Sequence, residues 1–265
     1  MADTYTHGHA DAVLQSHRWR TVENSAGYLV PHLRPGLAVL VVGCGPGTIT
    51  VDLARRVAPS RVLGLDVSAD PLDEARDLAA REGVQVEFAV GDVYALDLPD
   101  DSVDVVHAHQ VLQHLTDPVA ALREMARVCR PGGVLAVRDV DYATFVWFPD
   151  DAGLDRWLEL YHRVARHNGA EPDAGRRLLA WAHAAGLREL TATTSAWCYA
   201  TPAERRWWGS SWAGRATASA FAEQAVGYGL ATREELADVA AAWLRWAAAD
   251  DGWLSMTHGE LLVRV

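Results

Sequence analysis

A glycine-rich turn between a β-branched run and a helical pattern constrains this chain more than any other feature. Residues 38–42 (Ala-Val-Leu-Val-Val) predict a strand buried on both faces, and the turn 43–47 (Gly-Cys-Gly-Pro-Gly) follows directly. Residues 48–57 then show the spacing of an amphipathic helix. A strand, turn and helix in this order place backbone N–H groups and the positive end of the helix beside a ligand. The turn therefore predicts a nucleotide-binding α/β unit.

The spacing of the glycines separates this turn from two common nucleotide motifs. Gly43, Gly45 and Gly47 form G-x-G-x-G, whereas the dinucleotide fingerprint G-x-G-x-x-G wants a glycine or alanine where Thr48 stands. A phosphate-binding P-loop would require G-x-x-x-x-G-K-[ST], and no lysine follows this turn. The pattern therefore argues against NAD binding and against ATP hydrolysis.

Acidic residues follow the next two expected strands, 61–65 and 85–89. Asp66 ends the first of them, where a carboxylate can accept hydrogen bonds from both ribose hydroxyls of an adenosine. Asp92 follows the second, where it could accept a hydrogen bond from the exocyclic amine of adenine. Taken alone, Asp66 also suits a helix entry and Asp92 an ordinary turn, so it is the combination with the glycine turn that predicts an adenosine site.

The rest of the chain predicts one large α/β domain with additions. Further strands are expected at 103–108 and 134–139, with helices near 71–82 and 118–129, which is the alternation typical of a mostly parallel sheet. Residues 10–33 predict amphipathic helices, so we divide the chain into an N-terminal helical cap (1–34), a cofactor-binding core (35–145) and a remainder (146–265). The remainder predicts helices near 151–168, 173–185, 202–225 and 232–249, and strands near 187–199 and 253–264.

Composition narrows the classes of partner. A formal net charge of −11 argues against a nucleic-acid substrate, because binding to the phosphate backbone depends on clustered Lys and Arg. The first thirty residues carry charged groups throughout, so we expect no signal peptide, and because no apolar run approaches membrane-spanning length we expect no membrane-spanning segment. Cys44, Cys129 and Cys198 form no disulfide or metal pattern. We expect a cytoplasmic protein with no nucleic-acid or membrane partner, and homo-oligomer formation stays open.

Together these motifs resemble the class I S-adenosylmethionine-dependent methyltransferase family. The resemblance rests on residues 39–47, on Gly64-Leu65-Asp66-Val67-Ser68, on Gly91-Asp92 and on Arg130-Pro131-Gly132-Gly133. The segment 111–118 (VLQHLTDP) is similar to the small-molecule group that includes the ubiquinone and menaquinone biosynthesis methyltransferases. The resemblance implies a Rossmann-like, seven-stranded, mostly parallel sheet with helices on both faces. Its last strand would be antiparallel, so 187–199 and 253–264 would pair at one edge, and the helical insertion between them would form a lid.

The resemblance also implies S-adenosylmethionine as cofactor, S-adenosylhomocysteine as product and a small-molecule acceptor. The cofactor-binding residues expected from the motifs and the resemblance are Gly43, Cys44, Gly45, Gly47, Thr48, Asp66, Val67, Gly91, Asp92, Val93, His109 and Gln110. The family commonly has an acidic residue two positions before the first motif glycine, where this chain has Val41. The N-terminal helices could compensate through Arg18 or Asn24; the alternatives are a weaker cofactor site or a non-catalytic descendant.

Methyl transfer is an in-line displacement, so the protein chiefly positions the acceptor and excludes water, and we expect no metal. An acceptor hydroxyl or activated carbon must also lose a proton. The candidates for this step follow the fourth and fifth strands and are His109, His114, Asp139, Asp141 and Tyr142. Packing beside the cofactor remains the alternative for His109, and helix packing for His114. Near the N-terminus, His7 and His9 could bind a metal as a pair or hold a lid closed; the alternative is that both lie in a solvated tail.

Ten of the 11 tryptophans follow residue 145, which predicts an aromatic core and an aromatic chamber for the acceptor. The main hypothesis is therefore methylation of a small apolar or aromatic metabolite at an O, N or C nucleophile, in specialised metabolism. Two alternatives stay open. One is a catalytically silent cofactor-binding module, and the other is a nicotinamide oxidoreductase, whose sheet would look alike.

Overall fold

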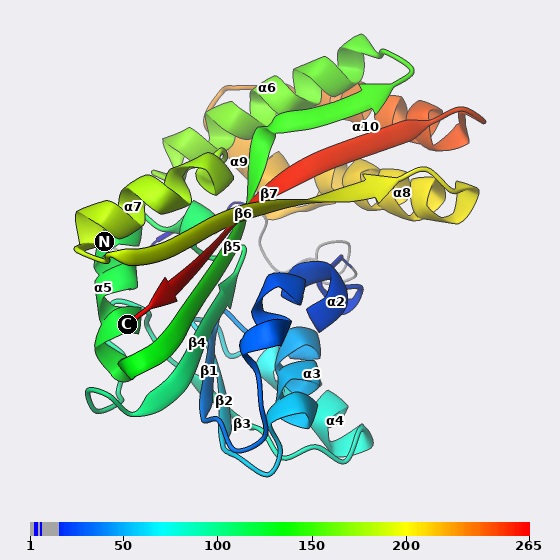
Figure 1. Ribbon diagram of the computed structural model, residues 1–265. Helices are drawn as coiled ribbons and strands as arrows, with labels where there is room; N and C mark the ends of the chain where they lie inside the picture. Colours follow the sequence, from blue (N-terminus) through cyan, green and yellow to red (C-terminus); the bar gives the residue numbers. More distant parts are fainter. Residues whose placement is uncertain (1–2, 5, 7–15) are drawn as a thin grey trace.

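A seven-stranded sheet in the order β3-β2-β1-β4-β5-β7-β6 organises the computed structural model, which describes residues 3–4, 6 and 16–265 (Figure 1). The strands are β1 Val39–Val42, β2 Val62–Asp66, β3 Glu87–Val90, β4 Val103–His109, β5 Cys129–Phe148, β6 Glu189–Tyr199 and β7 Trp253–Arg264. The first five pair in parallel, whereas β7 is antiparallel to both β5 and β6. The predicted seven-stranded sheet, with its last two strands paired at one edge, is therefore confirmed.

Helices cover both faces of the sheet. They are α2 Val22–Ser25, α3 Thr48–Val57, α4 Leu72–Arg81, α5 Pro118–Val128, α6 Ala152–His167, α7 Leu178–Ala185, α8 Pro202–Ala218, α9 Ala220–Gly227 and α10 Arg233–Ala248, with 3-10 turns η1 Gly27–His32, η2 Leu112–His114 and η3 Ala174–Arg177. Figure 1 shows α2, α3 and α4 on one face of the parallel strands and α5 and α7 on the other. Asp117 begins α5 by accepting a hydrogen bond from the Ala120 N–H at 2.9 Å, with Pro118 in the first turn, as the sequence predicts.

Strand β5 is much longer than predicted, because it continues from Asp139 to Phe148. Its pairing with β7 shifts register between Asp141 and Val146 and then resumes as far as Phe148 and Trp253. This extension, with the matching parts of β6 and β7, carries α6, α8, α9 and α10 in the upper part of Figure 1. The extended ends of β5, β6 and β7 therefore form, with these helices, a second packing unit beyond the parallel part of the sheet, which we call the second layer.

The second layer has an aromatic core of its own. Trp157 is fully buried and packs edge-to-face on Trp212 and Trp243, with ring centroids 4.5 and 4.8 Å apart. Edge-to-face contacts of this kind stabilise a core beyond the area that they bury. Trp253, at the end of the extension, is 42% exposed, so the tryptophans divide between core and surface.

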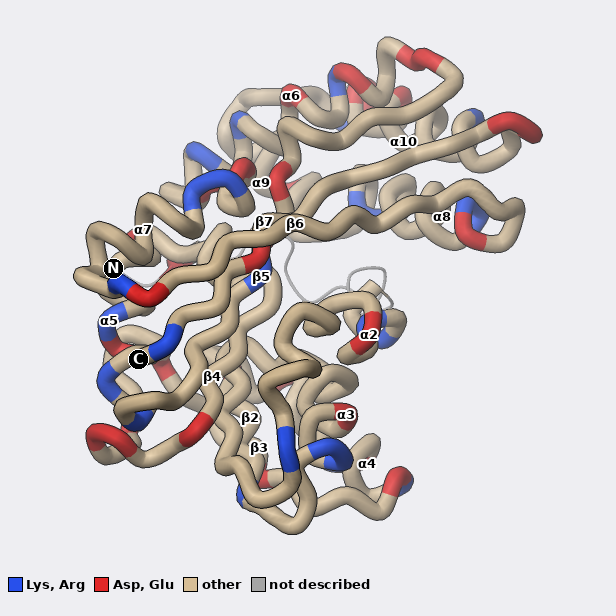
Figure 2. The backbone as a smooth tube through the Cα atoms, in the orientation of Figure 1, with Lys and Arg blue, Asp and Glu red and all other residues tan. Residues whose placement is uncertain are grey.

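Part of the N-terminal cap lies outside the described residues. This includes His7 and His9, and the first residues of the helix expected from residue 10. Within the part of the chain that the structure describes, no helix is both long enough and apolar enough to cross a membrane. Figure 2 shows basic and acidic positions interspersed along the backbone, as expected for a chain in which most charged side chains lie on the surface.

Candidate functional site

A pocket lies at the carboxyl ends of the parallel strands, where open α/β sheets bind ligands. One half, the cofactor half, is lined by the glycine turn and the segments after β2, β3 and β4. The other, the acceptor half, is lined by residues of β4, β5, β6, α8 and β7, and by two residues of the N-terminal segment. The residues of the acceptor half are Ser16, Arg20, His107, His109, Val140, Tyr142, Phe145, Trp197, Trp208, Arg215 and Met256.

The glycine turn presents bare backbone to the cofactor half. Gly43 has φ +66°, and a Cβ there would stand 2.4 Å from Val111 Cγ2, so another residue would clash. At Gly45 the space is open, because the nearest atom to a Cβ would be His17 Nδ1 at 3.8 Å. Gly47 precedes α3 at the back of the turn and packs against Ala75 rather than lining the pocket. The turn therefore leaves room for a ligand close to its N–H groups.

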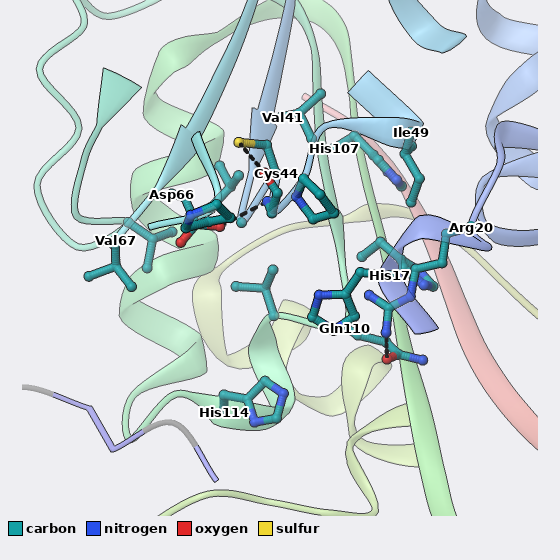
Figure 3. Close-up of a pocket in the computed structure, with 18 of the residues that line it drawn as sticks. His17, Arg20, Val41, Cys44, Ile49, Asp66, Val67, His107, Gln110 and His114 are labelled. Carbon is teal, nitrogen blue, oxygen red and sulfur yellow. Dashed lines mark hydrogen bonds between the residues drawn. The ribbon is translucent and has the colours of Figure 1, made fainter. Parts of the chain in front are cut away.

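Carboxylates from the ends of two strands meet in the same half. Asp66 Oδ2 accepts a hydrogen bond from the Gly45 N–H at 2.9 Å, and its Oδ1 accepts one from the Ser68 N–H at 3.1 Å. Figure 3 shows Asp66 and Val67 beside the turn. Asp92 accepts a hydrogen bond from the Tyr94 N–H at 2.9 Å. Further predicted residues that line this half are Cys44, Thr48, Gly91, Val93 and Gln110.

These groups fit S-adenosylmethionine. The open backbone at Gly45 leaves space for the ligand beside the helix N-terminus, while Asp66 and Asp92 offer acceptors for ribose hydroxyls and for an adenine amine. Burial raises the pKa of the Cys44 thiol well above its usual range, so this cysteine stays protonated and is no nucleophile.

The N-terminal segment contributes different side chains from those expected. Val41 lines the pocket, but Arg18 points away from it and forms an ion pair with Glu74 of α4, with Nε 2.6 Å from Oε1. Asn24 accepts a hydrogen bond from the Thr21 N–H at the start of α2. His17 and Arg20 line the pocket instead. Arg20 therefore takes the place expected for Arg18, because the helical residues end at Arg18 and the chain turns at Trp19, which brings Arg20 to the pocket.

Arg20 belongs to a hydrogen-bonded chain across the pocket. Its Nη2 donates to Gln110 Oε1 at 2.6 Å, as drawn in Figure 3, and Gln110 Nε2 lies 2.9 Å from His258 Nε2. Gln110 has φ +54°, in the left-handed region that few residues other than glycine adopt. Such strain is retained where surrounding contacts fix the residue, and here it turns the amide between Arg20 and His258.

Two histidines of β4 line the pocket, although the sequence predicts only His109. His107 and His109 share a face because side chains two apart on a strand point the same way, a signal that could have identified His107 as well. His107 Nδ1 lies 3.1 Å from the Ala136 carbonyl oxygen. Burial lowers the pKa of His107 to about 4 and the pKa of His109 well below its usual range, and the nearby Arg138 lowers both further. Both imidazoles are therefore neutral near pH 7.

Of the candidates on β5, Tyr142 lines the pocket and the two aspartates do not. Val140 and Tyr142 share the inner face, which puts Asp139 and Asp141 on the other face by strand alternation. Asp139 is fully buried and accepts a hydrogen bond from the Gln113 N–H at 3.1 Å. Asp141 forms an ion pair with Arg176, with Oδ2 2.5 Å from Nε. We therefore correct both aspartates from acceptor-side residues to residues that hold η2 and η3.

His114 lines the pocket on the cofactor side, after β4. Its Nε2 lies 2.9 Å from Gln113 Nε2. Burial lowers the pKa of His114 to about 3, so its imidazole is neutral as well.

The aromatic wall of the acceptor half was not assigned residue by residue from the sequence. Trp197 comes from β6, Trp208 and Arg215 from α8, and Met256 from β7. Trp197 packs on His258 with ring centroids 4.3 Å apart, and Trp208 stacks on Tyr199 at 4.5 Å. The tryptophan-rich composition indicated a chamber, but only the pairing of β6 with β7 and of β7 with β5 brings Trp197 and Met256 close to β4.

Comparison with known proteins supports the fold and shows the family. Residues 40–137 match the family model described as a methyltransferase domain. The chain is 33% identical to an uncharacterized methyltransferase of Schizosaccharomyces pombe over 98% of this chain and 96% of that protein. It is 34% identical to the 27-O-demethylrifamycin SV methyltransferase of Amycolatopsis mediterranei over 60% of this chain and 58% of that protein.

Among solved structures, the YcgJ protein from Bacillus subtilis superposes with a TM-score of 0.58 at 19% identity, covering 89% of this chain and 96% of that one. At this identity the likeness supports the fold alone. The match to the fission-yeast protein extends over nearly the whole of both chains, and the motifs of the cofactor half lie inside the matched domain. The chain belongs to the class I S-adenosylmethionine-dependent methyltransferases and takes its methyl group from S-adenosylmethionine.

Proposed function

We propose that the chain methylates a small apolar or aromatic acceptor bound in the acceptor half of the pocket. The observation that carries the proposal is that an aromatic wall, formed by Tyr142, Phe145, Trp197 and Trp208, is continuous with the cofactor half. Aromatic side chains offer large apolar surfaces with defined stacking geometry, which suits a flat or apolar body. A pocket set between β4, β6, α8 and the N-terminal residues Ser16 and Arg20 favours a small molecule over a protein or nucleic-acid chain.

In this proposal the cofactor half binds by hydrogen bonds and the acceptor half by apolar contact. Asp66 accepts hydrogen bonds from the ribose hydroxyls, Asp92 accepts one from the adenine amine, and Gln110, to which Arg20 of the acceptor half donates, lies toward the methionine portion. The cofactor supplies a methyl group on a sulfonium, which an aligned nucleophile displaces without further activation. The protein's own task is to hold the acceptor in line and to exclude water, for which the buried aromatic wall is suited.

The identity of the methylated class can be tested with methyl-labelled S-adenosylmethionine and a fractionated cell extract. We expect the label to enter low-mass products that partition into organic solvent, and we expect Trp208→Ala to reduce that incorporation by weakening acceptor binding. Trp253→Ala, which changes an exposed tryptophan away from the pocket, is the matched control. Label found only in protein or nucleic acid would contradict the proposal.

Replacing Asp66 by alanine is expected to weaken binding of S-adenosylhomocysteine by roughly 1–3 kcal/mol, because hydrogen bonds to a charged carboxylate are lost. The change also frees the Gly45 N–H, which Asp66 holds at 2.9 Å. Isothermal titration calorimetry on the variant measures the loss. Asp77→Ala on the exposed side of α4 should bind like the parent chain, and an unchanged affinity of Asp66→Ala would remove Asp66 from the site.

A further inference from the structure

The acceptor half holds buried polar atoms that have no hydrogen-bond partner among the described residues. Both ring nitrogens of His109 are in this state, as is Trp208 Nε1, and the two side chains are only 5% and 4% exposed. Buried polar groups in folded proteins nearly always have a partner, because leaving one unpaired costs about 1–3 kcal/mol. An unpaired imidazole that lines a pocket therefore points to a ligand with a hydrogen-bonding group.

The position of His109 puts it at the boundary between the two halves. It is the last residue of β4 and immediately precedes Gln110, which belongs to the cofactor half. Its ring lies 5.8 Å from that of Trp197 on the aromatic wall and 6.2 Å from that of His258. His107 lies two residues deeper and already contacts the Ala136 carbonyl. His109 is therefore the imidazole best placed to meet the reacting end of an acceptor.

The charges around the acceptor half distinguish between kinds of nucleophile. Arg20 and Arg215 line it, whereas Arg138, whose guanidinium lies 5.0 Å from the Trp197 ring centroid, is paired with Glu260, with Nε 3.3 Å from Oε1. The carboxylates among the described lining residues, Asp3, Asp66 and Asp92, belong to the cofactor half. Most aliphatic amines carry a positive charge at neutral pH, and these surroundings disfavour it. A hydroxyl group brings no such charge and can donate to a neutral imidazole.

We propose that the acceptor carries a hydroxyl group on its apolar or aromatic body and that His109 binds this hydroxyl and accepts its proton during methyl transfer. The inference rests on the proposed function. The hydroxyl oxygen forms the new bond to the methyl carbon, and the carbon–sulfur bond breaks with its electron pair going to sulfur. The hydroxyl proton passes to a ring nitrogen of His109, so the reaction is an O-methylation with no further reactant.

Methyl transfer changes the charge of the pocket in a way that allows His109 to accept a proton, although its protonation is disfavoured before the reaction. Burial and the nearby Arg20 and Arg138 keep the pKa of His109 well below its usual range before the reaction. Methyl transfer removes one positive charge from the pocket, since a sulfonium becomes a neutral thioether. The proton gained by His109 restores that charge, so the total in the pocket is the same before and after the step.

Binding of matched probes to the protein loaded with S-adenosylhomocysteine tests the inference by calorimetry. The probes are 1-naphthol, 1-naphthylmethylamine and 1-methoxynaphthalene, with phenol, benzylamine and anisole as a smaller set; both amines are aliphatic and protonated at neutral pH. We expect the hydroxyl member to bind about ten-fold more tightly than its partners, as one hydrogen bond to an otherwise unpaired group implies. His109→Ala should abolish this preference and His109→Gln should restore part of it. His183→Ala, at an exposed position of α7, should leave it unchanged.

A pH profile separates proton acceptance from mere packing. With a hydroxylated probe as acceptor, His109→Gln should lower kcat by about 100-fold or more while KM changes little, since general-base contributions have this size. The variant's rate should rise with pH as the probe itself ionises, whereas the parent chain should be flat above neutral pH.

The outcomes of these tests are distinguishable. Equal binding of hydroxyl and amine probes, or a hydroxyl preference that survives His109→Ala, overturns the inference and leaves the proposed function standing. If neither scaffold binds in any form while S-adenosylhomocysteine binds normally, the aromatic acceptor class itself is wrong. An unchanged kcat in His109→Gln also overturns the role of His109 as proton acceptor.

Discussion

Lowering the pH from 7 to 5 is expected to reduce the free energy of unfolding by an amount on the order of 5 kcal/mol. The cause is a set of histidines buried as neutral rings. Burial lowers the pKa of His107 to about 4 and of His114 to about 3, and places His109 and His258 well below the usual range. In the unfolded chain each titrates near 6.5. The unfolded chain therefore takes up protons below pH 6.5 that the folded protein resists.

One buried carboxyl group, that of Asp139, makes the folded protein more stable as the pH falls. Burial raises the pKa of Asp139 to about 7, so the folded protein holds a proton there that the unfolded chain has lost above about pH 4. Stability from Asp139 therefore rises as the pH falls through 7, while stability from the four histidines falls below 6.5. Because four histidines outweigh one aspartate, the free energy of unfolding falls as the pH is lowered. Each proton contributes about 1.4 kcal/mol per pH unit to this slope.

Urea unfolding followed by circular dichroism at pH 7, 6 and 5 measures this slope. His107→Gln should make the slope shallower by about one proton, because it removes one buried imidazole. His183→Gln, at an exposed position, should have the slope of the parent chain. If the free energy of unfolding is the same at pH 7 and pH 5, these histidines are not buried as neutral rings.

Replacing Trp157 by alanine is expected to lower the free energy of unfolding by about 3–5 kcal/mol, as for other large aromatic residues removed from a core. The side chain is fully buried and meets Trp212, Trp243 and Phe145, whose ring centroids lie 4.5, 4.8 and 5.3 Å away. A cavity at this point would remove one aromatic neighbour from each of those rings. Phe145 also lines the pocket, so acceptor binding should weaken as well.

Denaturant unfolding of Trp157→Ala, Trp157→Phe and Trp253→Ala provides the comparison. The phenylalanine variant should lose less than the alanine variant, because it refills most of the space. Trp253 is 42% exposed, and its removal should cost less than about 1 kcal/mol. Equal losses for Trp157→Ala and Trp253→Ala would show that the aromatic core contributes no special stability.

The cofactor half could be predicted from the sequence because its residues follow local rules. The turn at Gly43–Gly47, Asp66 after β2 and Asp92 after β3 each lie directly after a short buried strand. Parallel strands end at one edge, so these residues meet whatever the rest of the chain does. The sequence pattern also predicted strands at 187–199 and 253–264, but their pairing at one edge of the sheet was predicted only through the resemblance to a family.

The acceptor half could not be predicted in the same way, because it depends on phase and on distant pairing. Strand alternation separates Asp139 and Asp141 from Val140, but it does not say which face meets the ligand. Arg18 ends a short helical turn and Arg20 follows it, so which of the two faces the pocket depends on where that turn ends. Trp197 reaches β4 through β7 and β5, and the sequence holds no local sign of that order.

The length of β5 sets where this protein can be recombined with its relatives. Between Cys129 and Arg138 the strand pairs with β4, whereas from Val134 to Phe148 it pairs with β7. Cofactor residues precede this strand and most of the acceptor wall follows its midpoint, so an exchange of C-terminal halves would transplant substrate preference. A recombination point inside β5 would join two half-strands from different proteins, one adapted to its own β4 and the other to its own β7. Grafts should therefore begin before Cys129, so that β5 arrives together with its β7 and the new wall.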